Sequence, residues 1–211
     1  MTRLFTSMLF SAAMAASAMP AHAQVGPGLL DLNGVPEATL AALPGMTPAV
    51  AKAVVGRRPF ATIVDANTFL LEQKLTPTQL GSLYEKAFVH ISLNTGTAAE
   101  ILLIPRVGKR MTREFEEYRP WVTFGQFDKE IGKYVDAAEV NRLKQYVFIP
   151  LNLNRATDEQ FKTIPHLPAK MVREFNEYRP WKTKAQFDKE IGKYVDAKET
   201  ARLWRFMVIN P

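Results

Sequence analysis

The 211-residue sequence contains no cysteine, which excludes disulfides, thiol nucleophiles, thiolate zinc sites and iron–sulfur ligation. Histidine is scarce as well, and His90 and His166 stand alone without the spacing of metal ligands. Carboxylates are scattered among lysines and arginines, and the chain has no nucleophile-elbow, zinc-protease or phosphate-loop motif. These absences predict a protein that is not an enzyme and that uses no cofactor or metal.

Long apolar runs are lacking beyond the first two dozen residues. Arg3 precedes an almost wholly apolar or small stretch at residues 4–18, and residues 21–23 read Ala-His-Ala, the small-x-small pattern of a signal-peptidase site. The stretch is shorter than the ~20 residues that a membrane span needs. We therefore expect residues 1–23 to be a cleaved signal peptide. The mature chain, residues 24–211, is then periplasmic or secreted and has no membrane span.

What the sequence does contain is a repeat. Residues 126–137 recur letter for letter as residues 186–197, and weaker matches extend outward from both segments. A third, more diverged copy lies upstream. A fixed period of this size is typical of tandem structural units. We expect three units, at residues 24–91, 92–151 and 152–211.

The second unit gives the clearest pattern of short helices. Thr97 and Glu100 form a capping box, and apolar residues at helical spacing follow. Pro105 ends this first short helix, and a second helix carries Met111, Phe115 and Tyr118 at helical spacing. The Arg-Pro pair at residues 119–120 ends the second helix, because the residue before proline is pushed out of the α region. Trp121 then belongs to the core, and Asp136 caps a last helix.

This plan predicts an all-α fold with four short helices in each unit, since no segment shows strand-like alternation. Short joints connect the units, at residues 90–94 and 149–154, and they carry Ile and Leu rather than Gly and Ser. We therefore expect a semi-rigid, quasi-linear array.

Residues 43–48 of the first unit read Leu-Pro-Gly-Met-Thr-Pro, which resembles the helix-hairpin-helix motif. With Leu32-Asn33 and the four-helix plan, each unit resembles the competence DNA-receptor (ComEA-like) type of helix-hairpin-helix domain, in which two hairpins form a pseudo-symmetric pair. The resemblance covers nearly the whole mature chain. It implies sequence-independent binding of double-stranded DNA by a non-catalytic protein, with a role in DNA uptake.

In such hairpins, glycines let the backbone approach a phosphate, amides of the next helix donate to it, and nearby basic side chains add charge. The second unit keeps Gly108 with basic residues directly after it and is the best candidate clamp, whereas the third has His166 and Pro168 in place of both glycines. Carried over residue by residue, the resemblance gives these DNA-binding candidates: Gly45, Met46, Thr47 and Lys52 in the first unit; Val107, Gly108, Lys109, Arg110 and Arg113 in the second; Lys170 and Arg173 in the third.

An alternative stays open. The net charge of +6 permits a polyanionic partner without requiring one. The basic residues of the second hairpin alternate with glutamates, which is also typical of a solvated helix face. If the hairpins have lost their ligand, the chain is a structural or protein-interaction array whose partner is an envelope protein or a cell-wall polymer.

Overall fold

The computed structural model describes residues 25–209, so the predicted signal peptide lies outside them. The described part of the chain is mainly helical, with 12 short helices. They are α1 (Glu37–Ala41), α2 (Pro48–Arg57), α3 (Ile63–Glu72) and α4 (Pro77–Tyr84); α5 (Ala98–Ile101), α6 (Lys109–Glu117), α7 (Phe124–Ile131) and α8 (Ala137–Lys144); and α9 (Asp158–Phe161), α10 (Ala169–Glu177), α11 (Lys184–Ile191) and α12 (Ala197–Trp204).

Local capping explains where several helices begin. Thr97 and Glu100 form the predicted capping box at α5, with the Glu100 amide donating to Thr97 Oγ1 at 3.2 Å and the Thr97 amide donating to Glu100 Oε2 at 2.7 Å. Thr157 and Gln160 do the same at α9, and Asp136 accepts from the Glu139 amide at α8, as predicted. Each cap satisfies amides that a helix start would otherwise leave unpaired.

Short strands, which the sequence did not predict, close each set of four helices. They are β1 (Leu30–Asp31), β2 (Ala87–Phe88), β3 (Ile91–Ser92), β4 (Val147–Phe148), β5 (Leu151–Asn152) and β6 (Met207–Val208). Each pair β1–β2, β3–β4 and β5–β6 is parallel, so the two ends of each repeat lie side by side. Two residues are too few to show alternation, and the expectation of a purely α-helical chain is corrected to a mainly α-helical one.

A reciprocal pair of hydrogen bonds links the start of each repeat to its middle. In the second repeat, Asn94 Nδ2 donates to the Trp121 carbonyl at 2.9 Å, and the Trp121 amide donates to Asn94 Oδ1 at 2.7 Å. The pairs Asn33–Phe60 and Asn154–Trp181 repeat this arrangement. We call it the asparagine bracket. It holds the aromatic side chain in the core, where Trp121 is 1% exposed, as predicted.

The hydrophobic core is divided unequally. One cluster of buried residues runs continuously through the first two repeats, from Leu32 to Ile149. The rings of Phe88 and Tyr146 meet edge-on there, with centroids 5.0 Å apart. A second cluster fills the third repeat and takes in Val25 and Phe148. The first two repeats therefore share one apolar interior, and the third has its own.

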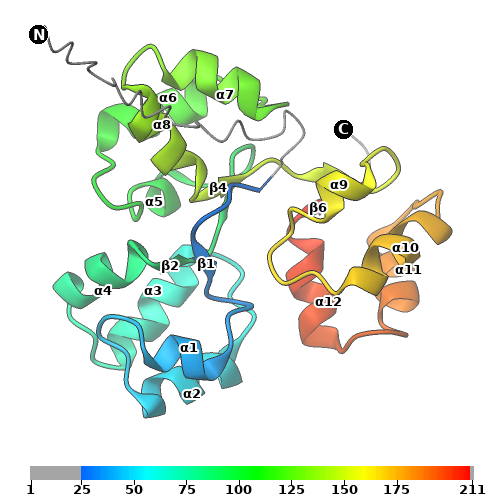
Figure 1. Cartoon of the computed structure of the whole chain (residues 1–211), viewed down its shortest axis with the longest axis horizontal. Helices are drawn as coiled ribbons and strands as arrows, with labels where there is room; N and C mark the ends of the chain where they lie inside the picture. Colours follow the sequence, from blue (N-terminus) through cyan, green and yellow to red (C-terminus); the bar gives the residue numbers. More distant parts are fainter. Residues whose placement is uncertain (1–24, 210–211) are drawn as a thin grey trace, which may run out of the picture.

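The third repeat folds back onto the first through α12. Arg202 is buried, with Nη1 donating to the Pro165 carbonyl at 2.6 Å and lying 3.7 Å from Asp31 Oδ2 of the first repeat. Lys198 Nζ donates to the Gly56 carbonyl at 2.9 Å. Figure 1 shows the three helical groups placed around the strands rather than in a row. The expected quasi-linear array is therefore wrong, because polar contacts that are remote in sequence close the chain on itself.

The side chain of Arg205 extends this interface to the joint between the first two repeats. Its Nε donates to the Ala61 carbonyl and its Nη2 to the His90 carbonyl, both at 2.9 Å. His90 is 1% exposed, and within the described residues neither of its ring nitrogens has a hydrogen-bond partner in good geometry. Burial lowers the pKa of His90 from its usual value near 6.5, against the opposing effect of Asp31.

Removing the bracket should destabilise the fold. Asn94→Ala leaves the buried backbone N–H and C=O of Trp121 without partners, and we expect the free energy of unfolding to fall by about 2–4 kcal/mol. Urea denaturation followed by tryptophan fluorescence measures this change. Asn141→Ala, at an exposed position of α8, is the matched control and should change little. Equal effects of the two substitutions would contradict the structural role of the bracket.

His90 should make stability depend on pH. Because its folded-state pKa is lowered, the unfolded chain binds the extra proton first, so the free energy of unfolding falls as pH drops below about 6.5, by up to ~1.4 kcal/mol per pH unit. We expect His90→Leu to flatten this slope between pH 7 and 5, measured by urea titrations at each pH. A slope unchanged by His90→Leu would show that His90 does not titrate in this window.

Candidate nucleic-acid interface

The turn between the first two helices of every repeat lies between α1 and α2, between α5 and α6, and between α9 and α10, and we call it the first hairpin. It keeps the same backbone conformation in all three copies, although its sequence varies. The residue after the hairpin proline is left-handed in all three copies: φ is 72° at Gly45, 66° at Arg106 and 55° at His166. This conformation costs a non-glycine residue about 1–2 kcal/mol. The turn is therefore retained in the copies that lack the first glycine, which sequence comparison alone did not reveal.

In the first repeat the amides of the hairpin are hydrogen-bonded mainly within the hairpin itself. The Met46 amide donates to the Leu43 carbonyl at 3.1 Å, and the Met46 side chain is buried in the core. Thr47 is the N-cap of α2, and its hydroxyl accepts from the Val50 amide at 3.2 Å. Since Pro48 has no amide, few donors at this helix start remain for a ligand.

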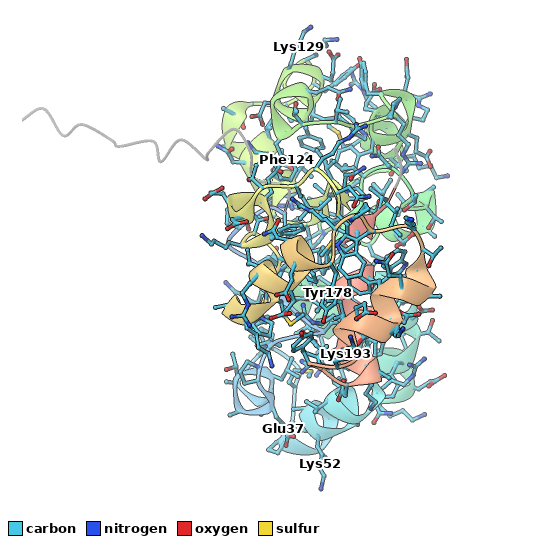
Figure 2. The ribbon with its side chains drawn as sticks, turned by 90° about the vertical axis from the view of Figure 1, so that its right-hand side faces the viewer. Glu37, Lys52, Phe124, Lys129, Tyr178 and Lys193 are labelled. Carbon is cyan, nitrogen blue, oxygen red and sulfur yellow. The ribbon has the colours of Figure 1, made fainter. Side chains whose placement is uncertain are left out.

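Lys52 is exposed on α2, and Figure 2 shows it pointing outward at the end of the molecule opposite Lys129 of the second repeat. No hydrogen bond or ion pair among residues 25–209 links Lys52 to Gly45, Met46 or Thr47. The first repeat thus has a well-formed turn, and the exposed cations of α2, Lys52 and Arg57, lie in the helix beyond its first turn.

In the second repeat the hairpin is open. Gly108 is the N-cap of α6 and contributes no side-chain cap, and no atom stands within 4 Å of the place that a Cβ would take. Its φ of −111° is one that other residues adopt, so the backbone conformation does not require glycine here, and the lack of a side chain leaves the start of α6 open. The amides of the first turn of α6 have no acceptor within the helix. Val107 is half-buried, and its amide donates to the Ile104 carbonyl at 3.0 Å.

The basic side chains beside this turn are exposed. Lys109, Arg110 and Arg113 take part in no ion pair among residues 25–209. Of the nearby glutamates, Glu114 is buried at 7% exposure, and Glu116 and Glu117, which are not buried, form no ion pair with these cations. The Arg110 guanidinium lies 5.7 Å from the centre of the Tyr134 ring.

A cavity of about 260 Å³ lies between the two hairpins of the second repeat. Its lining includes Arg106, Gly108, Arg110 and Glu114 from the first hairpin and α6, and Tyr134 and Glu139 from the second half of the repeat. The guanidinium of Arg142 donates to Glu139 and lowers the pKa of its carboxyl, so this acid is already paired. The arginines and the helix-start amides suit an anionic oxygen, whereas the carboxylate of Glu114 in the same lining, whose Oε2 has no hydrogen-bond partner among the described residues, opposes it.

In the third repeat the basic side chains beside the hairpin bond to other groups of the protein. Pro168 is the N-cap of α10, where it offers neither an amide nor a side-chain cap. Lys170 Nζ donates to the Tyr194 carbonyl at 3.3 Å, and Arg173 forms an ion pair with Glu174 at 2.8 Å. The His166 ring lies so close to Gly34 of the first repeat that a Cβ on Gly34 would stand 2.4 Å from it. This hairpin forms part of the contact between repeats.

The identical segments at residues 126–137 and 186–197 serve the scaffold. Gln126 accepts from the Val122 amide at 2.9 Å, and Tyr134 meets Tyr118 through their hydroxyls at 2.9 Å. Lys133 pairs with Glu130 on the surface. The Lys133 ammonium also lies 5.0 Å from the centre of the Tyr118 ring. In the third repeat the equivalent Lys193 ammonium lies 5.1 Å from the centre of the Tyr178 ring, and both residues are labelled in Figure 2.

Comparisons with protein-family models, curated proteins and solved structures found no match for this chain. None of the helices formed by residues 25–209 combines the length and apolar character needed to cross a bilayer. Over the same residues, no three His, Asp or Glu side chains are grouped so that they could hold a metal ion. The candidate interface is therefore judged on the geometry of its hairpins.

Glycine should be required at the first hairpin and dispensable in α4. Gly45→Ala places a Cβ 2.9 Å from Cβ of Gln79 in a left-handed residue, so we expect a loss of about 1–2 kcal/mol or more in the free energy of unfolding. Gly81→Ala, in open space within α4, should instead stabilise by about 0.5–1 kcal/mol. Both changes are measured by urea denaturation. Effects of the same sign would contradict the described turn.

Proposed function

We propose that the chain is an exported, non-catalytic protein that binds double-stranded DNA without sequence preference, through the hairpins of three tandem helix-hairpin-helix units. The second unit does most of the binding. Export follows from residues 1–23 acting as a cleaved signal peptide, and the mature protein then works in the periplasm or outside the cell. Its resemblance to competence DNA receptors makes DNA uptake or retention the physiological role.

One observation carries this proposal: the open helix start at Gly108 is followed by Lys109, Arg110 and Arg113, which are exposed and form no ion pair among residues 25–209. A phosphate held there would accept from the amides at the start of α6, and Lys109 and Arg110 would supply charge. Such contacts involve the sugar-phosphate backbone alone and carry no sequence information. The ligand expected is therefore duplex DNA in general.

The third hairpin uses Lys170 and Arg173 in contacts within the protein, and this limits the number of phosphate contacts that we expect. With two or three contacts, the logarithm of the binding constant should fall with the logarithm of salt concentration at a slope of roughly −2 to −3. A molecule in which all three hairpins held phosphate would give a steeper dependence.

The rival function is an interaction array for an envelope protein or a cell-wall polymer. It is favoured by the residues that the repeats share most closely, since the bracket and the segments at 126–137 and 186–197 are structural rather than basic. The two functions differ in what a charge change at the second hairpin should do.

Neutralising the second hairpin should weaken DNA binding. We expect Lys109→Gln with Arg110→Gln to reduce the salt slope by about two, and Lys109→Glu with Arg110→Glu to abolish saturable binding. Fluorescence anisotropy of a labelled duplex against residues 24–211, over a salt series, measures both.

Lys170→Gln with Arg173→Gln is the matched control in the third repeat and should leave the slope near its wild-type value. If the wild-type protein shows no saturable binding at low salt, the DNA proposal fails. If the two double variants weaken binding equally, the second hairpin is not the principal contact.

A further inference from the structure

One arginine of the second hairpin occupies a backbone position that suits glycine better. Arg106 has a φ of 66°, in the left-handed region where a side chain adds strain and glycine adds none. Gly45 takes this position in the first repeat, with a φ of 72°. Strained residues of this kind are held by contacts within the fold or cluster at ligand-binding sites. The contacts of the side chain decide between these two explanations.

In the third repeat the side chain at this position contacts the protein itself. His166 has a φ of 55°, and its ring lies so close to Gly34 of the first repeat that a Cβ on Gly34 would stand 2.4 Å from it. The imidazole thus belongs to the contact between the first and third repeats. A left-handed side chain has a place within the fold there.

Arg106 has no such contact. Its side chain is exposed, and among residues 25–209 it takes part in no ion pair and donates no hydrogen bond. Glu139 lines a cavity with it, but the Glu139 carboxylate already accepts from Arg142 Nε at 2.7 Å and from Arg142 Nη2 at 2.6 Å. No contact in the described part of the protein therefore accounts for an arginine rather than a glycine here.

The side chain of Arg106 stands beside the candidate ligand site. It lines the cavity of about 260 Å³ together with Gly108, the N-cap of α6. It also lines a cavity of about 310 Å³ between the first and second repeats, where Leu71 and Leu102 are exposed. The guanidinium thus lies at the surface between two openings, two residues before the open helix start.

Arg106 also decides the charge of the smaller cavity. The charged residues of its lining are two arginines, Arg106 and Arg110, and two glutamates, Glu114 and Glu139. Since Arg142 pairs with Glu139, two positive charges face one unpaired negative charge, and the lining has a net charge of +1. With glycine in place of Arg106 the net charge would be zero. Arg106 therefore supplies the excess positive charge that attracts an anion to this lining.

We propose that Arg106 binds a phosphate of the DNA backbone next to the phosphate held at the start of α6. Its planar guanidinium donates two parallel hydrogen bonds to phosphate oxygens, a geometry that lysine does not offer. This inference rests on the proposed DNA binding and adds a third cationic contact to those of Lys109 and Arg110. The wild-type salt slope should then lie near −3. The arginine weakens the free fold relative to glycine and strengthens the complex.

Arg106→Gly separates these two effects, because they have opposite signs. Removing the guanidinium should weaken binding of a labelled duplex roughly tenfold at fixed salt and reduce the salt slope by about one. Removing the left-handed side chain should leave the melting temperature of free residues 24–211 at or above the wild-type value. Fluorescence anisotropy over a salt series measures the first effect, and thermal denaturation followed by circular dichroism measures the second.

Two further substitutions at the same position assign the cause. Arg106→Ala keeps the left-handed strain, so it should bind DNA as weakly as Arg106→Gly and melt roughly 2–4 °C below it. Arg106→Lys should restore the salt slope and only part of the affinity, since an ammonium replaces the charge without the paired donors. His166→Gly is the matched control in the third repeat and should leave the affinity and the salt slope unchanged.

The outcomes distinguish this inference from the proposed function. Wild-type affinity and slope in Arg106→Gly, while Lys109→Gln with Arg110→Gln weakens binding, would overturn the role of Arg106 and leave DNA binding standing. A melting temperature of Arg106→Gly below the wild-type value would overturn it as well, since the side chain would then serve the fold. An absence of saturable binding by the wild-type protein would overturn both.

Discussion

The asparagine bracket is the constraint on which each repeat depends. Asn94 holds both backbone groups of Trp121, and this fixes the loop after α6 against the strand that opens the repeat. The buried indole then donates to the Phe115 carbonyl, so the C-terminal half of α6 is held as well. Because α6 starts at the hairpin, one polar pair sets the position of the turn that we assign to DNA. The residues of the bracket thus lie away from the first hairpin while fixing its position.

The three hairpins have the same shape and different surroundings. The turn survives at Arg106 and His166 despite the cost of a left-handed side chain, which shows that its geometry belongs to the scaffold. What differs is access. Thr47 caps its own helix, Pro168 removes a donor, and Gly108 leaves the helix start open. A function that needs free amides can persist in one copy while the others serve packing.

The sequence predicted features that depend on neighbouring residues. The capping box at Thr97 and the burial of Trp121 follow from local chemistry and apolar patterning, and both are confirmed. The two-residue strands carry no periodic signal, so they were missed. The return of the third repeat was also missed, because Arg205 bonds carbonyls 115 and 144 residues away and no local pattern encodes such a contact. Likewise, the accessibility of Gly108 depends on what stands around it in space.

The closed arrangement gives the third repeat a role other than ligand binding. Its α12 sends Arg202 and Arg205 into the first repeat and the first joint, where Asp31 and His90 are buried. Buried charges of this kind add little net stability, but removing one partner is costly, so they favour one arrangement over its alternatives. The first two repeats are held together by their shared apolar core instead. We conclude that the polar interface fixes the orientation of the third repeat.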